Sequence, residues 1–131
     1  MSRYVRVETS ARTLDELAAA LAALELIVER GQAGARLMLQ GSLECAGEPV
    51  DLRLPPGQLD AVEDFGFLRG PTGRIELVCG EYDRSLLEER LLPRLAAALT
   101  RARARAHAKR AGLAVEEVLE ADGLRIKLRT R

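Results

Sequence analysis

In the first quarter of the chain, apolar residues recur first at every second position, as in a strand, and then at every third or fourth position, as in a helix. Residues 4–8 alternate apolar and polar side chains, a pattern that predicts a short strand. Thr13 and Glu16 stand in capping-box spacing, in which each side chain can satisfy a backbone N–H at the start of a helix. The apolar stripe of that helix is formed by Leu14, Leu17, Ala18, Leu21 and Leu24. A short apolar run over 26–28 then predicts a buried strand.

The middle of the chain keeps the period of two that is typical of strands. Alternating segments cover 37–45, 50–54, 64–68 and 75–79, with Gly41 as a candidate bulge in the first. Turn-forming residues separate them at Gly47-Glu48-Pro49, Pro55-Pro56-Gly57 and Gly70-Pro71-Thr72-Gly73. Strands joined by such short turns indicate an antiparallel meander with one covered face.

The last third of the chain predicts a long helix and a hairpin. Ser85 and Glu88 form a second capping box. The apolar stripe of the helix is formed by Leu87, Leu91, Leu95, Ala98, Ala102 and Ala106. Pro93 either kinks this helix or separates a short first helix from the main one, and Gly112 is a natural stop. Two alternating segments on either side of Asp122-Gly123 predict the hairpin.

The order of these elements predicts an α+β fold. We expect a mostly antiparallel sheet (β-α-β, meander, α-β-β) with two helices packed on one face. The 131 residues suffice for a core, and we expect a single domain over 1–131. Aromatic residues make up only 3% of the chain, so the core is expected to consist of Leu, Val, Ile and Ala. The same scarcity disfavours proteins that stack bases or sugars on aromatic rings.

The chain has neither a membrane span nor a signal peptide in its pattern. No stretch reaches the roughly 18 apolar residues of a span, and the opening MSRYVRVETS lacks the apolar region of a signal peptide. The richness in Ala, Leu and Arg is typical of a GC-rich bacterial genome, so we expect a cytoplasmic bacterial protein. In a reducing cytoplasm, Cys45 and Cys79 are expected as buried free thiols.

Charge is balanced overall but unevenly distributed. Residues 1–80 hold 8 Lys/Arg and 12 Asp/Glu, a net charge of −4, whereas residues 81–131 hold 12 Lys/Arg and 8 Asp/Glu, a net charge of +4. A dipolar chain of this kind can associate with itself or with an acidic partner.

The most informative local feature is the basic C-terminal third. No acidic residue occurs between positions 94 and 110, and basic residues alternate with apolar ones over 124–129. The candidate residues for binding an anion or a partner are Arg94, Arg101, Arg105, Lys109, Arg125, Lys127 and Arg129. The simpler interpretation is a solvated surface, because Arg favours helices, cations suit a helix C-terminus, and charge protects a sheet edge.

Few residues offer catalytic or metal-binding chemistry. His107 is the only histidine, and a surface position on the long helix is its simpler interpretation. Carboxylates cluster at Asp60, Glu63 and Asp64 and again at Glu81 and Asp83. Neither cluster has the spacing of a calcium loop. We therefore predict no catalytic residue, no cofactor and no metal site, with a metal-dependent enzyme as a minor alternative.

Three segments resemble a known family. They are MSRYVRVETSARTLDELAAALAALELIVE at the start, FGFLRGPTGRIELVCGEYD in the middle and AKRAGLAVEEVLEADGLRIKLRTR at the end. In their order, and over nearly the whole chain, they resemble the uncharacterised small-protein family of cyanobacteria and red-algal plastids catalogued as domain of unknown function 1257. The resemblance implies a fold and a bacterial or plastid-like setting, and it implies no reaction.

The chain departs from that family in its aromatic residues. Members generally carry Trp near positions 80–82, Tyr in the long helix and often a C-terminal Trp. Here the corresponding places hold Gly80-Glu81-Tyr82, Leu99, Arg101 and Arg131. If those aromatic residues form a binding surface in the family, this chain has lost or altered it.

These observations favour a non-enzymatic protein-interaction module or accessory subunit. We expect its partner to be another protein, with an acidic protein as one candidate, or a second copy in a homodimer. The alternative is a nucleic-acid or phosphate-binding domain that uses the same basic face, in which case affinity would fall steeply with salt.

Overall fold

The computed structural model describes residues 3–32, 35–41, 47–120 and 123–130, and beyond residue 112 it describes side chains only at Ile126 and Lys127. The strands are β1 (Tyr4–Glu8), β2 (Glu29–Arg30), β3 (Leu37–Met38), β4 (Pro49–Val50), β5 (Leu52–Leu54), β6 (Phe65–Arg69), β7 (Ile75–Gly80), β8 (Leu113–Glu120) and β9 (Gly123–Thr130). The helices are α1 (Leu14–Ala23), α2 (Arg84–Arg90) and α3 (Leu92–Ala111), with short 3-10 turns η1 (Gln58–Asp60) and η2 (Glu81–Asp83).

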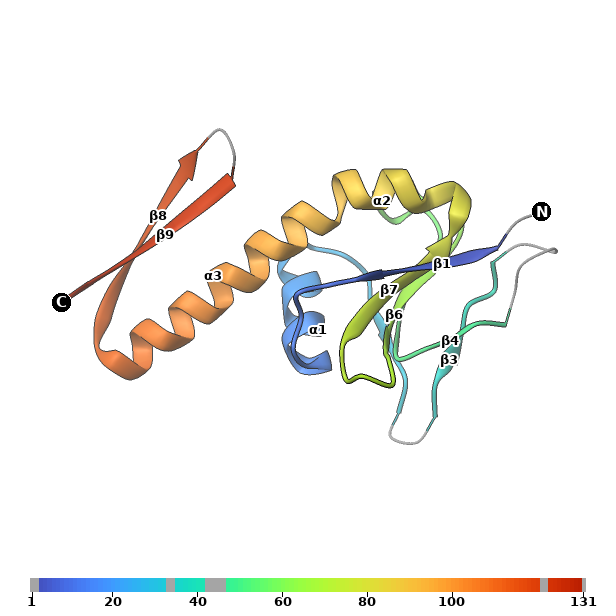
Figure 1. The fold of residues 1–131 in the computed structure, drawn as a ribbon, viewed down its shortest axis with the longest axis horizontal. Helices are drawn as coiled ribbons and strands as arrows, with labels where there is room; N and C mark the ends of the chain where they lie inside the picture. Colours follow the sequence, from blue (N-terminus) through green and yellow to red (C-terminus); the bar gives the residue numbers. More distant parts are fainter. Residues whose placement is uncertain (1–2, 33–34, 42–46, 121–122, 131) are drawn as a thin grey trace.

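The central sheet is antiparallel throughout, in the order β1-β7-β6-β5-β2. Alternate residues on its strands, such as Phe65, Phe67 and Leu77, are fully buried in one core with the helices. Figure 1 shows α1, α2 and the first part of α3 beside this sheet. The predicted α+β class is therefore confirmed, as are the strands over 4–8, 64–68 and 75–79.

The opposite face of the sheet is also covered, so the prediction of one covered face is wrong. Leu39, Val50, Leu68 and Val78 form a second buried cluster, to which the separate β3–β4 sheet contributes. The predicted strand over 50–54 breaks at Asp51, whose N–H donates to the carbonyl of Phe67 at 2.8 Å. That break sends Val50 to one face and Leu52 to the other.

The start of α1 follows the predicted cap, whereas the segment after it does not form the predicted strand. Thr13 Oγ1 accepts from the N–H of Glu16 at 3.1 Å, and Glu16 Oε2 accepts from the N–H of Arg12 at 2.8 Å. Glu25 then adopts a left-handed φ of 62°. This turn leaves Ile27 62% exposed, and the strand β2 begins only at Glu29.

The helix C-terminus before that turn has the hydrogen bonds of a Schellman motif. The N–H of Leu26 donates to the carbonyl of Leu21 at 3.2 Å, and the N–H of Glu25 donates to that of Ala22 at 2.9 Å. Glutamate occupies the left-handed position that favours glycine. The sequence gives no usual stop signal there, which explains why a strand was expected over 26–28.

The second predicted helix is divided at Leu91. Hydrogen bonds still continue through the junction. The N–H of Leu91 donates to the carbonyl of Leu87 at 2.9 Å, and the N–H of Leu95 donates to the carbonyl of Leu91 at 2.8 Å. Pro93 lies in the first turn of α3, where a backbone N–H has no partner within the helix, so that its missing N–H costs α3 no hydrogen bond of its own. The predicted capping box at Ser85 is wrong, because α2 already begins at Arg84 after η2 and has no side-chain cap.

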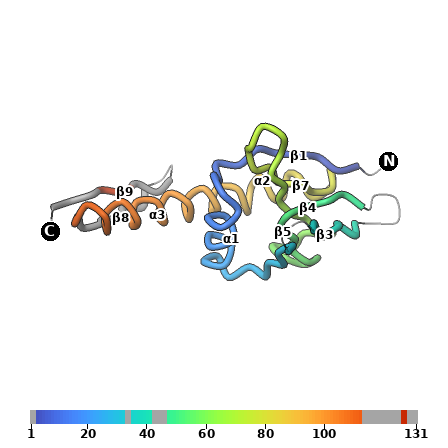
Figure 2. Tube along the Cα trace, turned by 90° about the horizontal axis from the view of Figure 1, so that it is seen from below, coloured from blue at the N-terminus to red at the C-terminus, as the bar shows by residue number. Residues whose placement is uncertain are grey.

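The apolar stripe of α3 is buried only along its first half. Leu95, Ala98 and Leu99 are buried, whereas Ala102 and Ala106, predicted to continue the stripe, are exposed. Beyond Leu99 the helix leads away from the sheet (Figures 1 and 2). The spacing of apolar residues along a helix does not indicate at which residue the rest of the protein stops covering that helix.

The chain ends in a hairpin that forms its own sheet. Gly112 has a φ of 69° and its N–H donates to the carbonyl of Ala108, which ends α3 as predicted. β8 and β9 pair with each other and lie along α3. Ala108 is buried yet belongs to neither core cluster. Asp122, in the predicted turn, and Cys45 lie outside the described residues.

Candidate functional site: the basic C-terminal arm

The distal part of α3 and the hairpin β8–β9 form an extension of the molecule. We name residues 100–130 the C-terminal arm. Figure 1 shows it on the far side of α1 from the loops around β3 and β4. A two-stranded hairpin is only marginally stable by itself, so its packing along α3 holds it in place.

The structure places five of the seven predicted binding residues. Arg94, Lys109 and Lys127 are exposed, and none makes an ion pair with another described residue. Arg101 and Arg105 lie on α3 beside α1. Spacings of seven, four and four residues put the four predicted cations of α3 within about 80° of one another around the helix, so these four share one face. Arg103 and Arg110 lie on the opposite side of the same helix.

The predicted basic face of the last strand is only partly described. Ile126 is half-buried and its neighbour Lys127 is exposed, which agrees with the predicted alternation at these two positions. In the register of the hairpin, position 127 stands opposite position 116, and 125 opposite 118. The side chains of Arg125 and Arg129 lie outside the described part of the chain.

A groove separates α1 from α3 at the root of the arm. Its lining consists of Ala19, Ala20 and Ala23 from α1 and Ala98, Arg101, Ala102 and Arg105 from α3. We call it the alanine groove, and its volume is about 330 Å³. Of the alanines that line the groove, the sequence indicated only Ala98 and Ala102, as members of the apolar stripe of the long helix. A usable signal was the change from leucine to alanine along the α3 stripe after Leu95.

Arg103 fastens α3 across the start of α1. Its guanidinium donates to both carboxylate oxygens of Glu16, at 2.5 and 3.0 Å, and to the carbonyl of Ser10 at 2.6 Å. Both side chains are largely covered. The hydrogen bond from Arg103 is the main cause that lowers the pKa of Glu16. The two helices that form the groove are thus held in a fixed relation near its edge.

The buried acidic residues bind the backbone. Asp64 accepts from the N–H groups of Gln40 and Gly41 at 2.7 and 2.8 Å, and from Arg53 Nε at 2.8 Å. Asp83 accepts from the N–H groups of Val62 and Glu63, both at 3.0 Å. Both aspartates are at most 2% exposed. These contacts fasten loops to the sheet.

The remaining residues of the acidic clusters are divided between the surface and one buried position. Asp60 pairs with Arg90 at 2.7 Å and Glu81 with Arg3 at 3.2 Å. Glu63 Oε2 is buried without a hydrogen-bond partner among the described residues. Burial, then the charges of Asp83 and Asp64, raise the pKa of Glu63. Within the described chain, no three His, Cys, Asp or Glu side chains are placed to hold a metal ion.

Cys79 and His107 differ in their surroundings. Cys79 is a buried free thiol in β7, as expected, and burial raises its pKa to about 12. His107 is exposed on α3, also as expected.

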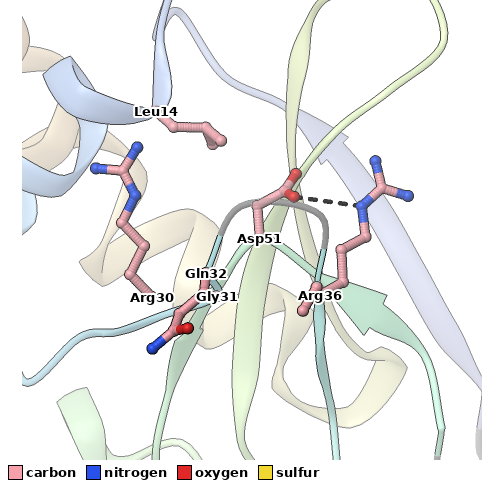
Figure 3. Close-up of a pocket in the computed structure, with 7 residues that line it drawn as sticks. Leu14, Arg30, Gly31, Gln32, Arg36 and Asp51 are labelled. Carbon is pink, nitrogen blue, oxygen red and sulfur yellow. Dashed lines mark hydrogen bonds and ion pairs between the residues drawn. The ribbon is translucent and has the colours of Figure 1, made fainter.

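Another pocket lies beside the start of α1, with a volume of about 600 Å³ (Figure 3). Arg30 and Arg36 flank it, and Asp51 stands between them. Each cation already faces a carboxylate: Arg36 pairs with Asp51 at 3.3 Å, and Arg30 with Asp15 at 2.6 Å. An anionic ligand would have to displace these carboxylates, so the pocket is a weaker candidate than the arm.

Among the residues that the structure describes, no helix combines the length and the apolar content needed to cross a membrane. No family model, curated protein or solved structure matches the chain. The resemblance to the family of domain of unknown function 1257 stays a prediction.

Proposed function

We propose that the protein is a non-enzymatic interaction module or accessory subunit of the bacterial cytoplasm, and that the C-terminal arm binds an acidic partner protein. The observation that carries the proposal is the course of α3. Its apolar stripe leaves the core after Leu99, so Ala102 and Ala106 are exposed on a helix whose neighbouring face is basic. The cations suit an acidic protein partner through charge complementarity, and the exposed methyl groups beside them add apolar area that such a partner can cover.

A nucleic-acid or phosphate-binding function is the second candidate, supported by the same cations. Arg94, Lys109 and Lys127 are available to phosphates without breaking an ion pair to a described residue. Phosphate neutralisation would make affinity fall steeply with salt. Against it stands the formal net charge of zero, since nucleic-acid-binding domains usually carry a basic excess.

The test compares two triple variants of the full chain with matched changes in charge. One carries Arg94→Glu, Lys109→Glu and Lys127→Glu, and the control carries the same change at the exposed Arg12, Arg69 and Arg74. Each is purified by affinity from the native host, with and without nuclease. We expect one stoichiometric partner protein that is retained after nuclease, lost with the first variant and kept with the control.

Two results would contradict the proposal. One is recovery of the wild-type chain without any stoichiometric protein. The other is a partner that disappears on nuclease treatment, together with a fluorescence titration in which DNA or RNA binds with a steep dependence on salt. The second result would favour the nucleic-acid function instead.

A further inference from the structure

The strand β1 ends the central sheet, and no other described strand pairs with its outer side. On its inner side, the N–H of Thr9 donates to the carbonyl of Ile75 at 3.0 Å and continues the ladder with β7. The odd positions of β1 therefore bind β7, and the alternation of an antiparallel ladder directs the main-chain groups of Arg6 and Glu8 outward. Figure 1 shows β1 in front of β6 and β7.

These outward main-chain groups make β1 a place where another strand can be added. Within the part of the chain that the structure describes, no residue is paired with them. A row of unpaired N–H and C=O groups pairs readily with the edge of another strand. The opposite edge of the sheet is β2, which has two residues, whereas β1 has five. Of these two edges, β1 is the one long enough to carry an added strand.

The sequence of β1 is complementary to itself in one two-fold register. A two-fold axis at Arg6 or at Glu8 would put identical charges directly opposite each other, which is unfavourable. An axis at Val7 puts the two valines together and places Arg6 opposite Glu8 of the second copy. Four main-chain hydrogen bonds then join Arg6 and Glu8 across the axis, two on each side.

The charged side chains of β1 keep their own partners in this register. Arg6 pairs with Glu48 at 2.6 Å, and Glu8 pairs with Arg74 at 3.2 Å. The axis at Val7 asks neither side chain to leave its partner, because the main chain makes the bonds between the copies. The register is favoured because it leaves no like charges directly opposed.

The same register brings an apolar side chain beside a pocket. Residues 8–10 and α3 line this pocket, whose volume is about 240 Å³. Its lining from α3 consists of Leu92, Leu95 and Ala96. Val5 is half-buried and packs against the core on the face that the helices cover. Val5 of the second copy would stand opposite Thr9 on that face, next to the pocket, and the two-fold axis repeats this contact.

We infer that β1 is a dimer edge, at which a second copy of the chain adds its own β1 antiparallel, with the two-fold axis at Val7. The mode is the addition of a strand to a sheet edge, and it joins two central sheets into one. None of the residues in this contact belongs to the C-terminal arm, so the inference does not rest on the proposed function.

Sedimentation of the full chain over a range of concentrations measures the dimer. Glu8→Pro removes an outward N–H and adds a ring at the edge, while the ladder with β7 keeps its bonds. The matched control, Glu8→Ala, loses the same side chain and its pair with Arg74 but keeps the N–H. We expect the dissociation constant of the control to stay within about twofold of wild type, and that of Glu8→Pro to rise at least about tenfold.

Cysteine cross-linking measures the register, and it decides the question even if the proline variant does not fold. In a Cys45→Ser background, Val7→Cys places two thiols at the axis. The facing Cα atoms of such a pair lie about 4.5 Å apart, within the range of a disulfide. Val5→Cys is the matched control, because Val5 is also half-buried on the same face but faces Thr9 of the second copy. We expect mild oxidation to join two chains through position 7 and not through position 5.

Three outcomes overturn the inference. A wild-type monomer at every concentration would show that the charges of β1 protect the edge instead. An unchanged dimer of a folded Glu8→Pro, or cross-links from position 5 as readily as from position 7, would place the contact elsewhere. A different protein that binds the monomeric wild type but not Glu8→Pro would assign the edge to a foreign strand.

The dimer edge and the proposed function are tested separately. The Glu variant of Arg94, Lys109 and Lys127 should dimerise like wild type, because none of these residues lies on β1. A failure of that variant to bind the partner protein therefore leaves the dimer edge standing, and a wild-type monomer leaves the proposed function standing.

Discussion

Arg103 and Glu16 are 87 positions apart, and their side chains meet in a two-bonded ion pair that joins α3 to the start of α1. Glu16 at the same time accepts from the N–H of Arg12, so one carboxylate serves both the helix cap and the tertiary contact. The pair and the cap therefore stabilise the same junction.

Replacing Arg103 with Ala is expected to lower the free energy of unfolding by about 2 kcal/mol, between the values for exposed and buried ion pairs. Urea unfolding measures the difference. Arg103→Lys keeps the charge but loses the fork, so it should recover only part of the stability. The control Arg94→Ala, at an exposed position, should stay within about 0.5 kcal/mol of wild type. An equal effect of both Ala variants would contradict this role.

The lowered pKa of Glu16 makes a prediction for acid stability. The folded protein favours the carboxylate form of Glu16. The contribution of this carboxylate to stability is therefore complete above its pKa in the unfolded chain, which is about 4.3. It is lost as pH falls through the lower folded pKa. Unfolding experiments between pH 7 and pH 2 should therefore show a steeper loss of stability for wild type than for Glu16→Gln. Parallel curves would exclude the linkage.

The pKa of Glu63 is shifted in the opposite direction to that of Glu16, so its effect on stability depends on pH in the opposite way. Burial raises its pKa, so the folded protein binds a proton more readily than the unfolded chain. This carboxyl contributes stability at low pH, which is lost as pH rises from about 4.3 through the raised folded pKa. Glu63→Gln should increase stability at pH 7 and change it little at pH 4. Carboxyl NMR titration measures the pKa directly, and a value at or below that of an exposed Glu would refute the prediction.

The left-handed position after α1 offers a stabilising change. Glu25→Gly should raise the free energy of unfolding by about 0.5–1 kcal/mol. Glycine adopts a φ of 62° without the penalty of a Cβ, and this gain exceeds the larger chain entropy that glycine loses on folding. The matched Ala22→Gly, inside the helix, should lower it by about 1 kcal/mol. Thermal and urea unfolding of both variants decide the sign.

Cys79 should be inert in the folded protein. Its thiol is buried and its pKa is about 12, so the reactive thiolate is scarce at neutral pH. In a Cys45→Ser background, a chromogenic thiol reagent should react only at the rate of unfolding, and rapidly in denaturant. Fast labelling under native conditions would show that the thiol is accessible.

Local patterns predicted the elements whose partners are near in sequence. The alternation around Phe65 and Phe67 required only a strand with one buried face, and Thr13 required only the three residues after it. The second covered face of the sheet and the end of the buried stripe of α3 were not predicted, because they depend on contacts between residues far apart in the sequence. Val50 turns away from Leu52 because Asp51 binds the backbone of Phe67, a contact that no local pattern encodes.

The candidate site was predictable in its charges but not in its shape. Arg101 and Arg105 could be named from the absence of acidic residues around them. Their neighbours in the groove, Ala19 and Ala23, come from a helix near the other end of the chain. Only the packing of α1 against α3 brings these residues together. Arg103 contributes to that packing through its ion pair with Glu16, a contact that the basic segment around it does not indicate.

The junction at Leu91 has a geometric consequence for the reach of the arm. From Pro93 to Gly112 a straight helix spans about 28 Å at 1.5 Å per residue. A change of about 10° in the angle between α2 and α3 would therefore carry the base of the hairpin sideways by about 5 Å. Hydrogen bonds pass through the junction on both sides of Leu91, and the Arg103–Glu16 pair holds α3 further along its length. These two contacts together fix the position at which the hairpin is presented.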